Sequence, residues 1–264
     1  MYEFTYERPK SVPAALKALQ KSKDAKYLAG GMSLIPTLKL RLAEVSELVD
    51  LSDLKQLKGI KKQRSAIVIG AMTTHAEVAS SKDVAKTIPA LAALAEGIGD
   101  PQVRNRGTIG GSLAHADPAA DYPAGVVGLG ATIHTNKRKI SADKFFKSMF
   151  ETALAKNEII TAVSFPIPKR AAYIKFPNPA SRYAIVGVMV SEGKDGVRVA
   201  VTGAGPSVFR VKAMEKALTT NFSPAAIEAI SVPADDLNDD LHASAEYRAH
   251  LVTVMAKRAV AAAG

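Results

Sequence analysis

Two double-glycine turns are the parts of this sequence best suited to chemistry. The first is Ala29-Gly30-Gly31-Met32-Ser33-Leu34, and the second is Thr108-Ile109-Gly110-Gly111-Ser112. Adjacent glycines leave backbone N–H groups uncovered and permit positive φ, which close approach to a phosphate requires. Each turn lies between a strand-like and a helix-like run, and Ser33 is a candidate N-cap whose helix dipole would also favour an anion. The pair predicts two loops that close on one polyanionic ligand.

Four reactive side chains follow the second turn closely: Ser112, His115, Asp117 and Asp121. In a hydrolase, Ser112 would be the nucleophile of an elbow-like turn and His115 its base, but residues so close in sequence rarely reach triad geometry. In a metal site, His115, Asp117 and Asp121 would supply ligands, yet their spacing gives no obvious shared face. In a dinucleotide site, the glycines bind phosphate, Ser112 donates, and Asp121 accepts from a cofactor hydroxyl. Asp117 is also expected to cap the helix that follows it.

The composition excludes several classes of function. The 264 residues include no cysteine, so this chain holds no disulfide, thiolate nucleophile or iron–sulfur cluster of its own. Neither a Walker A pattern nor Gly-x-Gly-x-x-Gly is present, which argues against a P-loop enzyme and an ordinary Rossmann site. The sequence shows no transmembrane stretch and no signal peptide at its start, so we expect a cytoplasmic protein, with peripheral attachment to the inner face of the membrane left open.

A formal net charge of +10 would also suit a nucleic-acid or anion-binding module. The lysines are scattered, however, and the densest basic group, Lys58 to Arg64, has no aromatic residues among it. Tryptophan is absent, which disfavours a base-stacking platform. A solvated basic surface is the better interpretation, and no nucleic-acid partner is expected.

Apolar periodicity divides the chain into regions at residues 1–55, 56–165 and 166–264. In the first, β-type runs alternate with a helix capped by Ser11 and a helix at 34–42, which predicts a β-α-β-α-β unit. The second has helical patterns at 73–79, 89–95 and 118–129, a polar loop at 100–107, and strand patterns at 66–70, 131–135 and 158–165.

The third region begins after a proline-interrupted segment at 165–170. Its strand patterns are at 173–176, 184–190 and 197–202, and its helical patterns at 209–218, 224–230 and 245–263. We therefore expect an α+β C-terminal domain with a three-stranded antiparallel sheet and helices. The chain as a whole is predicted to be α+β, with two α/β subdomains preceding this domain.

Three stretches resemble a known family. Residues 29–42 and 108–123 are similar to the FAD-binding signatures of the flavoprotein (medium) subunit of molybdenum hydroxylases, the xanthine dehydrogenase and aerobic carbon monoxide dehydrogenase family. Residues 173–188 are similar to the C-terminal domain of that subunit. The resemblance implies a PCMH-type FAD-binding domain of two subdomains, residues 1–55 and 56–165, followed by a C-terminal flavoprotein domain at 166–264.

The resemblance also implies the residues that bind FAD. Both glycine turns would hold the pyrophosphate, Asp121 a polar part of the cofactor, and Ile160 the adenine end. Lys175 would lie near the flavin and Tyr183 against its ring. The alternatives are a surface lysine at Lys175 and a half-buried strand residue at Tyr183. The full set is Ala29, Gly30, Gly31, Met32, Ser33, Leu34, Thr108, Ile109, Gly110, Gly111, Ser112, Asp121, Ile160, Lys175 and Tyr183.

By the same resemblance, this chain transfers electrons and needs no nucleophile or metal ligand of its own. Electrons would pass from a molybdopterin-containing large subunit, through a small iron–sulfur subunit, to FAD and then to an external acceptor. A dimer of heterotrimers is the implied assembly. The alternative within enzymes is a stand-alone FAD-dependent oxidoreductase. The hydroxylated substrate would be chosen on another polypeptide, so carbon monoxide, aldehydes and N-heterocycles all stay open.

Overall fold

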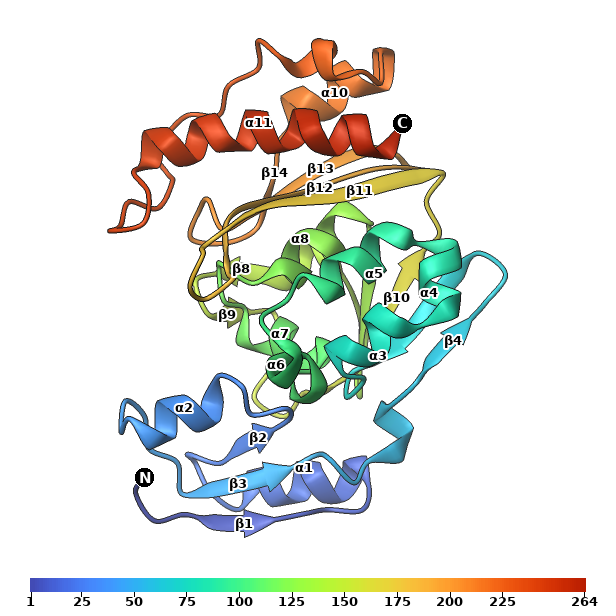
Figure 1. Ribbon diagram of the computed structural model, residues 1–264. Helices are drawn as coiled ribbons and strands as arrows, with labels where there is room; N and C mark the ends of the chain where they lie inside the picture. Colours follow the sequence, from blue (N-terminus) through green and yellow to red (C-terminus); the bar gives the residue numbers. More distant parts are fainter.

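The N-terminal segment folds as a small parallel sheet with helices, as its alternating pattern predicts. The computed structural model describes residues 1–264 and is mixed α/β (Figure 1). In the first sheet β3 lies between β1 and β2, and both neighbours run parallel to it. The elements are β1 (Thr5–Glu7), α1 (Val12–Gln20), β2 (Lys26–Leu28), α2 (Leu34–Lys39) and β3 (Glu47–Asp50). Ser11 caps α1, because its hydroxyl accepts from the Ala14 N–H at 3.3 Å.

The second helix of this unit differs from its prediction. It ends at Lys39 rather than at residue 42, and the leucines beyond it, Leu40 and Leu42, are exposed. Arg41 adopts a φ of 57°, which stops the helix. Ser33 occupies the N-cap position, but its side chain accepts no N–H group from the helix. The expected cap is therefore absent, and the amides that precede α2 stay uncovered.

The middle segment builds an antiparallel five-stranded sheet in the order β4-β5-β10-β6-β7. Its strands are β4 (Ile60–Lys62), β5 (Ala66–Gly70), β6 (Thr132–Thr135), β7 (Lys139–Ser141) and β10 (Ile160–Pro166), preceded by a 3-10 turn, η1 (Lys55–Leu57). The helices are α3 (His75–Ser80), α4 (Lys82–Thr87), α5 (Pro89–Glu96), α6 (Pro101–Arg106), α7 (Ile109–His115), α8 (Asp121–Gly128) and α9 (Ala142–Phe145). A hairpin of β8 (Phe146–Ser148) and β9 (Glu151–Thr152) follows α9.

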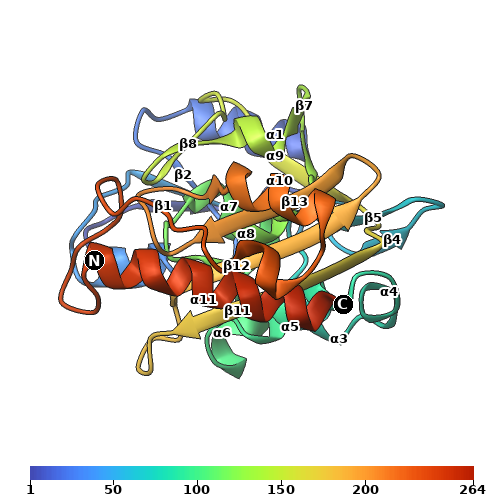
Figure 2. The ribbon, with the colours of Figure 1, turned by 90° about the horizontal axis from the view of Figure 1, so that it is seen from above.

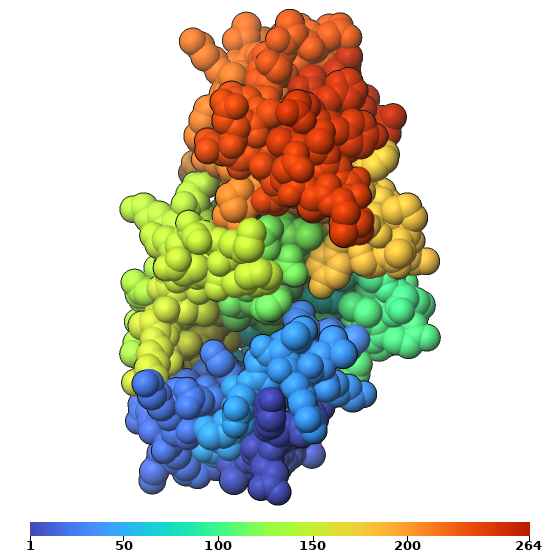
Figure 3. Space-filling model, turned by 90° about the vertical axis from the view of Figure 1, so that its left-hand side faces the viewer, coloured from blue at the N-terminus to red at the C-terminus, as the bar shows by residue number.

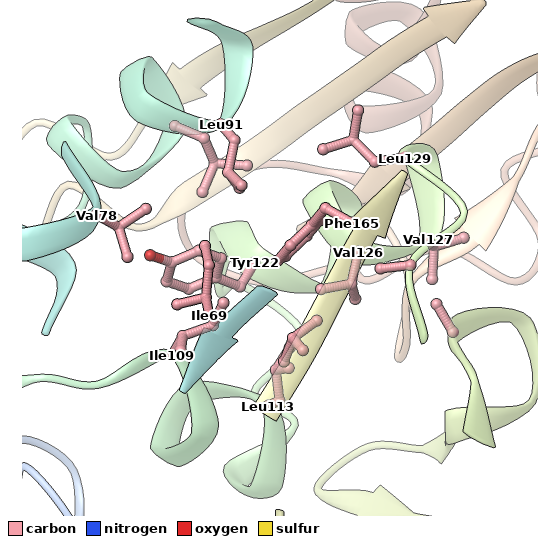
Figure 4. Packing of buried hydrophobic residues seen from close by; sticks show 14 of the residues in the cluster. Ile69, Val78, Leu91, Ile109, Leu113, Tyr122, Val126, Val127, Leu129 and Phe165 are labelled. Carbon is pink, nitrogen blue, oxygen red and sulfur yellow. The ribbon is translucent and has the colours of Figure 1, made fainter. Parts of the chain in front are cut away.

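The largest core lies between this sheet and its helices. Tyr122 and Phe165 lie at its centre, with Leu91 and Ile69 close by (Figure 4), and all four are fully buried. Tyr122 belongs to α8, in which every residue is buried. This helix also contacts the C-terminal sheet, so it ties the second and third parts of the molecule together.

Three local predictions for the middle segment were wrong. Residues 101–106 form α6 rather than a loop, because the Asp100 carboxylate caps it by accepting from the Val103 N–H at 2.8 Å. Helix α8 begins at Asp121 rather than at Pro118. Asp117 does not cap α8. Its carboxylate accepts from the Ala119 N–H at 2.9 Å, within the turn that precedes this helix. The second double glycine lies inside α7, whose N-cap is Thr108, rather than in a loop.

The C-terminal segment is an antiparallel sheet of four strands, not three: β11 (Arg170–Pro177), β12 (Ala184–Gly193), β13 (Gly196–Thr202) and β14 (Phe209–Arg210). The short β14 pairs with β13 and takes the first residues of the helix predicted at 209–218. The helical elements are α10 (Lys212–Thr220), the 3-10 turn η2 (Pro224–Ile227) and the long α11 (Ala245–Ala263). One face of the sheet carries α11, as Figures 1 and 2 show, and the other contacts α5 and α8.

Candidate functional site

A cavity of about 650 Å³ lies where the N-terminal unit meets the middle segment. The two parts meet along a hollow in the surface (Figure 3). Ligand pockets of this kind commonly have volumes of about 300–1,000 Å³. Of the residues predicted to bind FAD, all but Ile109 and Lys175 line it: Ala29, Gly30, Gly31, Met32, Ser33, Leu34, Thr108, Gly110, Gly111, Ser112, Asp121, Ile160 and Tyr183.

The first double-glycine turn lines the cavity with a row of free amides. The N–H groups of residues 30 to 34 have no acceptor anywhere in the protein. Gly31 has a φ of 76°, which turns the chain before α2. Free N–H groups ahead of and within the first turn of a helix can bind an anion, so these amides, which belong to residues that line the cavity, are candidate anion ligands. They are the donors that the predicted anion site requires, and anion binding here stays a prediction. We call residues 30–34 the amide row.

Gly30 has a second role, at the contact between the two parts of the molecule. A Cβ atom built on Gly30 would overlap the carbonyl oxygen of Arg106 and lie 2.8 Å from the Cα of Gly107. Only glycine therefore lets the amide row approach the end of α6 so closely. The contact fixes the width of the cavity at this point.

The second double glycine does not provide free amides, which corrects the reasoning from sequence. The Gly110 N–H donates to the Ala71 carbonyl at 2.8 Å, and the Gly111 N–H to the Thr108 hydroxyl at 3.1 Å. A Cβ on Gly110 would lie 2.7 Å from the Ala71 oxygen, so the glycine allows α7 to pack against the end of β5. Ile109 points into the core and is fully buried. This turn shapes the cavity wall, and the Thr108 N–H is the one amide here without an acceptor.

Asp121 is a buried acid in the cavity wall. Its Oδ1 accepts from the Tyr173 hydroxyl at 2.5 Å and lies 3.0 Å from the ammonium of Lys175. Burial raises the pKa of Asp121, while the Lys175 charge and the Tyr173 hydrogen bond oppose that rise. Asp121 also begins α8, where the helix dipole favours a negative charge. The carboxylate is thus fixed in orientation by residues of β11.

Lys175 lies behind the cavity wall rather than in it. Besides Asp121, its ammonium donates to the Gly97 carbonyl at 2.8 Å and to the Arg182 carbonyl at 2.9 Å. All three N–H bonds of the ammonium therefore have protein acceptors. The side chain joins the end of α5, the start of α8 and the loop before Tyr183. It is not the surface lysine of the alternative interpretation, because only 10% of it is exposed.

Tyr183 lies at the mouth of the cavity and is 43% exposed. Phe150, from the turn between β8 and β9, is a second exposed aromatic there, and its ring centroid lies 5.0 Å from that of His115. Phe150 and Arg182 both have positive φ, at 56° and 61°. Non-glycine residues in this conformation cluster at functional sites. The mouth thus carries two exposed aromatic side chains, with Arg182 and His115 also in the lining.

Another part of the cavity lining is apolar. It includes Ile160 and three residues of the smaller core cluster, Leu57, Met72 and Ile159, while the buried Glu158 next to Ile159 also lines the cavity. Sequence reasoning missed Leu57 and Met72, of which Met72 lies in the connection from β5 to α3. The cavity thus combines free amides, carboxylates and apolar side chains in its lining.

The hydrolase and metal interpretations find no support in this geometry. The ring of His115 packs against Phe150 and makes no hydrogen bond to Ser112. No three His, Asp or Glu side chains converge as a metal site would require. No helix is both long and apolar enough to cross a bilayer.

Comparison with known proteins defines the class. Residues 2–168 match the family model described as the FAD binding domain in molybdopterin dehydrogenase. Residues 171–263 match that of the CO dehydrogenase flavoprotein C-terminal domain. The chain belongs to this family of FAD-binding subunits of molybdopterin dehydrogenases. It is an oxidoreductase subunit whose cofactor is FAD, and the unpaired amides of the amide row are chemically suited to the diphosphate of that cofactor.

The individual relatives agree with this assignment. The chain is 37% identical to the carbon monoxide dehydrogenase medium chain of Hydrogenophaga pseudoflava, over 98% of this chain and 96% of that one. A solved carbon monoxide dehydrogenase from the same organism superposes with a TM-score of 0.90 over 99% of this chain and 97% of that chain. The xanthine dehydrogenase FAD-binding subunit of Escherichia coli O157:H7 is 27% identical over 100% of this chain and 99% of that one.

Proposed function

We propose that this chain is the electron-transfer subunit of a molybdenum-containing hydroxylase of the carbon monoxide dehydrogenase type. FAD bound in the cavity supplies the redox chemistry, since flavin can take electrons singly and deliver them singly or in pairs. The amide row carries the proposal, because it offers a diphosphate five consecutive donors that nothing in the protein occupies. No side chain of this chain acts as a nucleophile. Its residues bind and orient the cofactor.

The proposed partners are a large molybdopterin subunit and a small iron–sulfur subunit, in a dimer of heterotrimers. Relatives named as medium chains support a heteromeric complex. The absence of cysteine supports it too, because any iron–sulfur cluster must come from another chain. The exposed rim of Tyr183 and Phe150 provides an open edge through which electrons could reach the cofactor.

Sequence identity to the relatives does not identify the substrate of the complex. The carbon monoxide dehydrogenase medium chain is 37% identical and the nicotine 6-hydroxylase medium subunit of Paenarthrobacter nicotinovorans 36%, although their names give different substrates. In the proposal, the substrate is selected on the large subunit. The alternative of a stand-alone flavin oxidoreductase would require a substrate pocket beside the FAD cavity of this chain.

Purification of the native complex tests the proposal. We expect the chain to be purified together with a molybdenum-containing and an iron–sulfur subunit, and its flavin to be reduced when substrate is added to the complex. A chain that is purified alone with FAD and reacts directly with a small substrate would favour the stand-alone enzyme. A colourless chain with steeply salt-dependent DNA binding would favour the basic module.

A further inference from the structure

His75 is a buried histidine in the wall of the cavity that sequence reasoning did not single out. It is the first residue of α3, whose N-cap Thr74 forms a capping box with Glu77. Its backbone N–H donates to the Gly107 carbonyl at 2.9 Å. The residue is 5% exposed, and it lines the cavity. The backbone at His75 is therefore held by hydrogen bonds on both sides.

The imidazole of His75 has no hydrogen-bond partner in the protein. Its Nδ1 is buried without a hydrogen-bond partner, and Nε2 is the ring nitrogen that lies beside Gly107. The ring packs against Tyr122, with ring centroids 5.3 Å apart. Leaving a buried polar group unpaired costs about 1–3 kcal/mol. That cost concerns Nδ1, which is fully buried, so Nε2 is the ring nitrogen available to a ligand in the cavity.

The ring lies next to the amide row. A Cβ on Gly107 would lie 2.5 Å from His75 Nε2, and a Cβ on Gly30 would lie 2.8 Å from the Gly107 Cα. His75 Nε2 and Gly30, the first residue of the amide row, are thus both neighbours of Gly107. A side chain at 107 would fill the space into which Nε2 faces.

The imidazole is neutral here. Burial and the nearby charge of Arg104 lower the pKa of His75 to about 4. A neutral ring presents one N–H donor and one acceptor. It can thus contribute a donor to an anion without the cost of burying a cation.

We propose that His75 is a further cofactor-binding residue, which donates a hydrogen bond from Nε2 to a diphosphate oxygen of FAD beside the amide row. The inference rests on FAD being bound in this cavity. It adds a side-chain donor to a site that otherwise binds the diphosphate with backbone amides. The donor comes from the middle segment, so the diphosphate would join the two parts of the molecule.

The test compares FAD affinity of the purified chain, stripped of cofactor, by quenching of flavin fluorescence. His75→Phe keeps the ring packed on Tyr122 and removes both nitrogens, while His75→Gln keeps a donor. The control is His134→Phe, because His134 also has an unpaired buried nitrogen but lies on β6 outside the cavity. Displacement of FAD by ADP, which carries the diphosphate without the flavin, gives a second affinity.

We expect His75→Phe to weaken binding of FAD and of ADP by about tenfold or more, the effect of losing a hydrogen bond to a charged group. His75→Gln should recover part of the loss, and His134→Phe should bind as the wild type does. The cofactor-free Phe variants should unfold at the same or a higher temperature than the wild type, since no protein partner is lost and an unpaired buried nitrogen is removed. Unchanged affinity in His75→Phe, an equal loss in His134→Phe, or a loss for FAD without one for ADP would overturn the inference. Wild-type protein that binds no FAD would instead refute the proposed function.

Discussion

The ammonium of Lys175 lies 3.0 Å from the carboxylate of Asp121, and together they form a buried ion pair at the back of the cavity. The two residues come from β11 and the start of α8. The Lys175 side chain also holds the carbonyl of Arg182, the residue before Tyr183. The pair therefore connects the C-terminal sheet, the middle core and the rim of the cavity. The pair influences the cofactor site by holding Arg182, and thereby Tyr183, in position.

Removing one member of this pair should be costly. In Lys175→Met, Asp121 keeps only the Tyr173 hydroxyl, and we expect the free energy of unfolding to fall by about 3–5 kcal/mol. Urea unfolding of the cofactor-free chain measures this. The double variant Lys175→Met/Asp121→Asn should recover much of the loss, because it buries no unpaired charge. A single variant as stable as the wild type would show that the pair does not hold the three elements together.

Gly30 should tolerate no side chain. In Gly30→Ala, the added Cβ would overlap the Arg106 carbonyl, so either the amide row or the end of α6 must shift. We expect a stability loss of about 1–3 kcal/mol and weaker FAD binding, measured by thermal unfolding and by titration with FAD. Gly193→Ala is the matched control, because a Cβ there meets no atom within 4 Å. Equal behaviour of the two variants would argue against the close contact.

Stability should depend on Glu158 at acid pH. Its carboxylate accepts from Arg138 at 2.9 and 3.0 Å, and these bonds lower its pKa from 4.5 to about 2. The Glu158 carboxylate therefore binds a proton more readily in the unfolded chain than in the folded one. Its contribution to the free energy of unfolding is present above pH 4.5 and is lost as the pH falls toward 2.

At neutral pH, Glu158 should contribute about 1–3 kcal/mol to the free energy of unfolding. The lower end of this range takes into account that the Arg138 side chain is exposed, because solvent weakens the ion pair. Glu158→Gln should thus lower the free energy of unfolding at pH 7 and converge with the wild type near pH 2. Chemical denaturation across this pH range checks it. A constant difference between the two proteins at every pH would mean that the charge is not responsible.

The sequence predicted the free amides of the site best where residues close in sequence decide whether an amide is paired. Gly30 and Gly31 lie between a strand and a helix that are close in sequence, and their free amides follow from that turn alone. The amides of Gly110 and Gly111 could not be assessed in this way. The acceptor of Gly110 is the Ala71 carbonyl at the end of β5, which only the packing of α7 brings near.

Long-range contacts also decided the roles of Lys175 and His75. The acceptors of Lys175 come from α5, α8 and a distant loop, so its pattern in sequence could not show that its ammonium is fully used. Thr74 and Glu77 did predict a helix start, but not that His75 within it lines the cavity. The fourth strand was missed because β14 has only two residues, too few for an alternating pattern.

The most direct test of the account is the FAD bound per chain in wild-type protein and in Gly30→Ala, with Gly193→Ala as control. FAD is released by denaturation and quantified against protein. The account predicts about one FAD per chain in the wild type and in Gly193→Ala, and a clear deficit in Gly30→Ala. Full FAD content in Gly30→Ala, or none in the wild type, would contradict the claim that the amide row holds the cofactor.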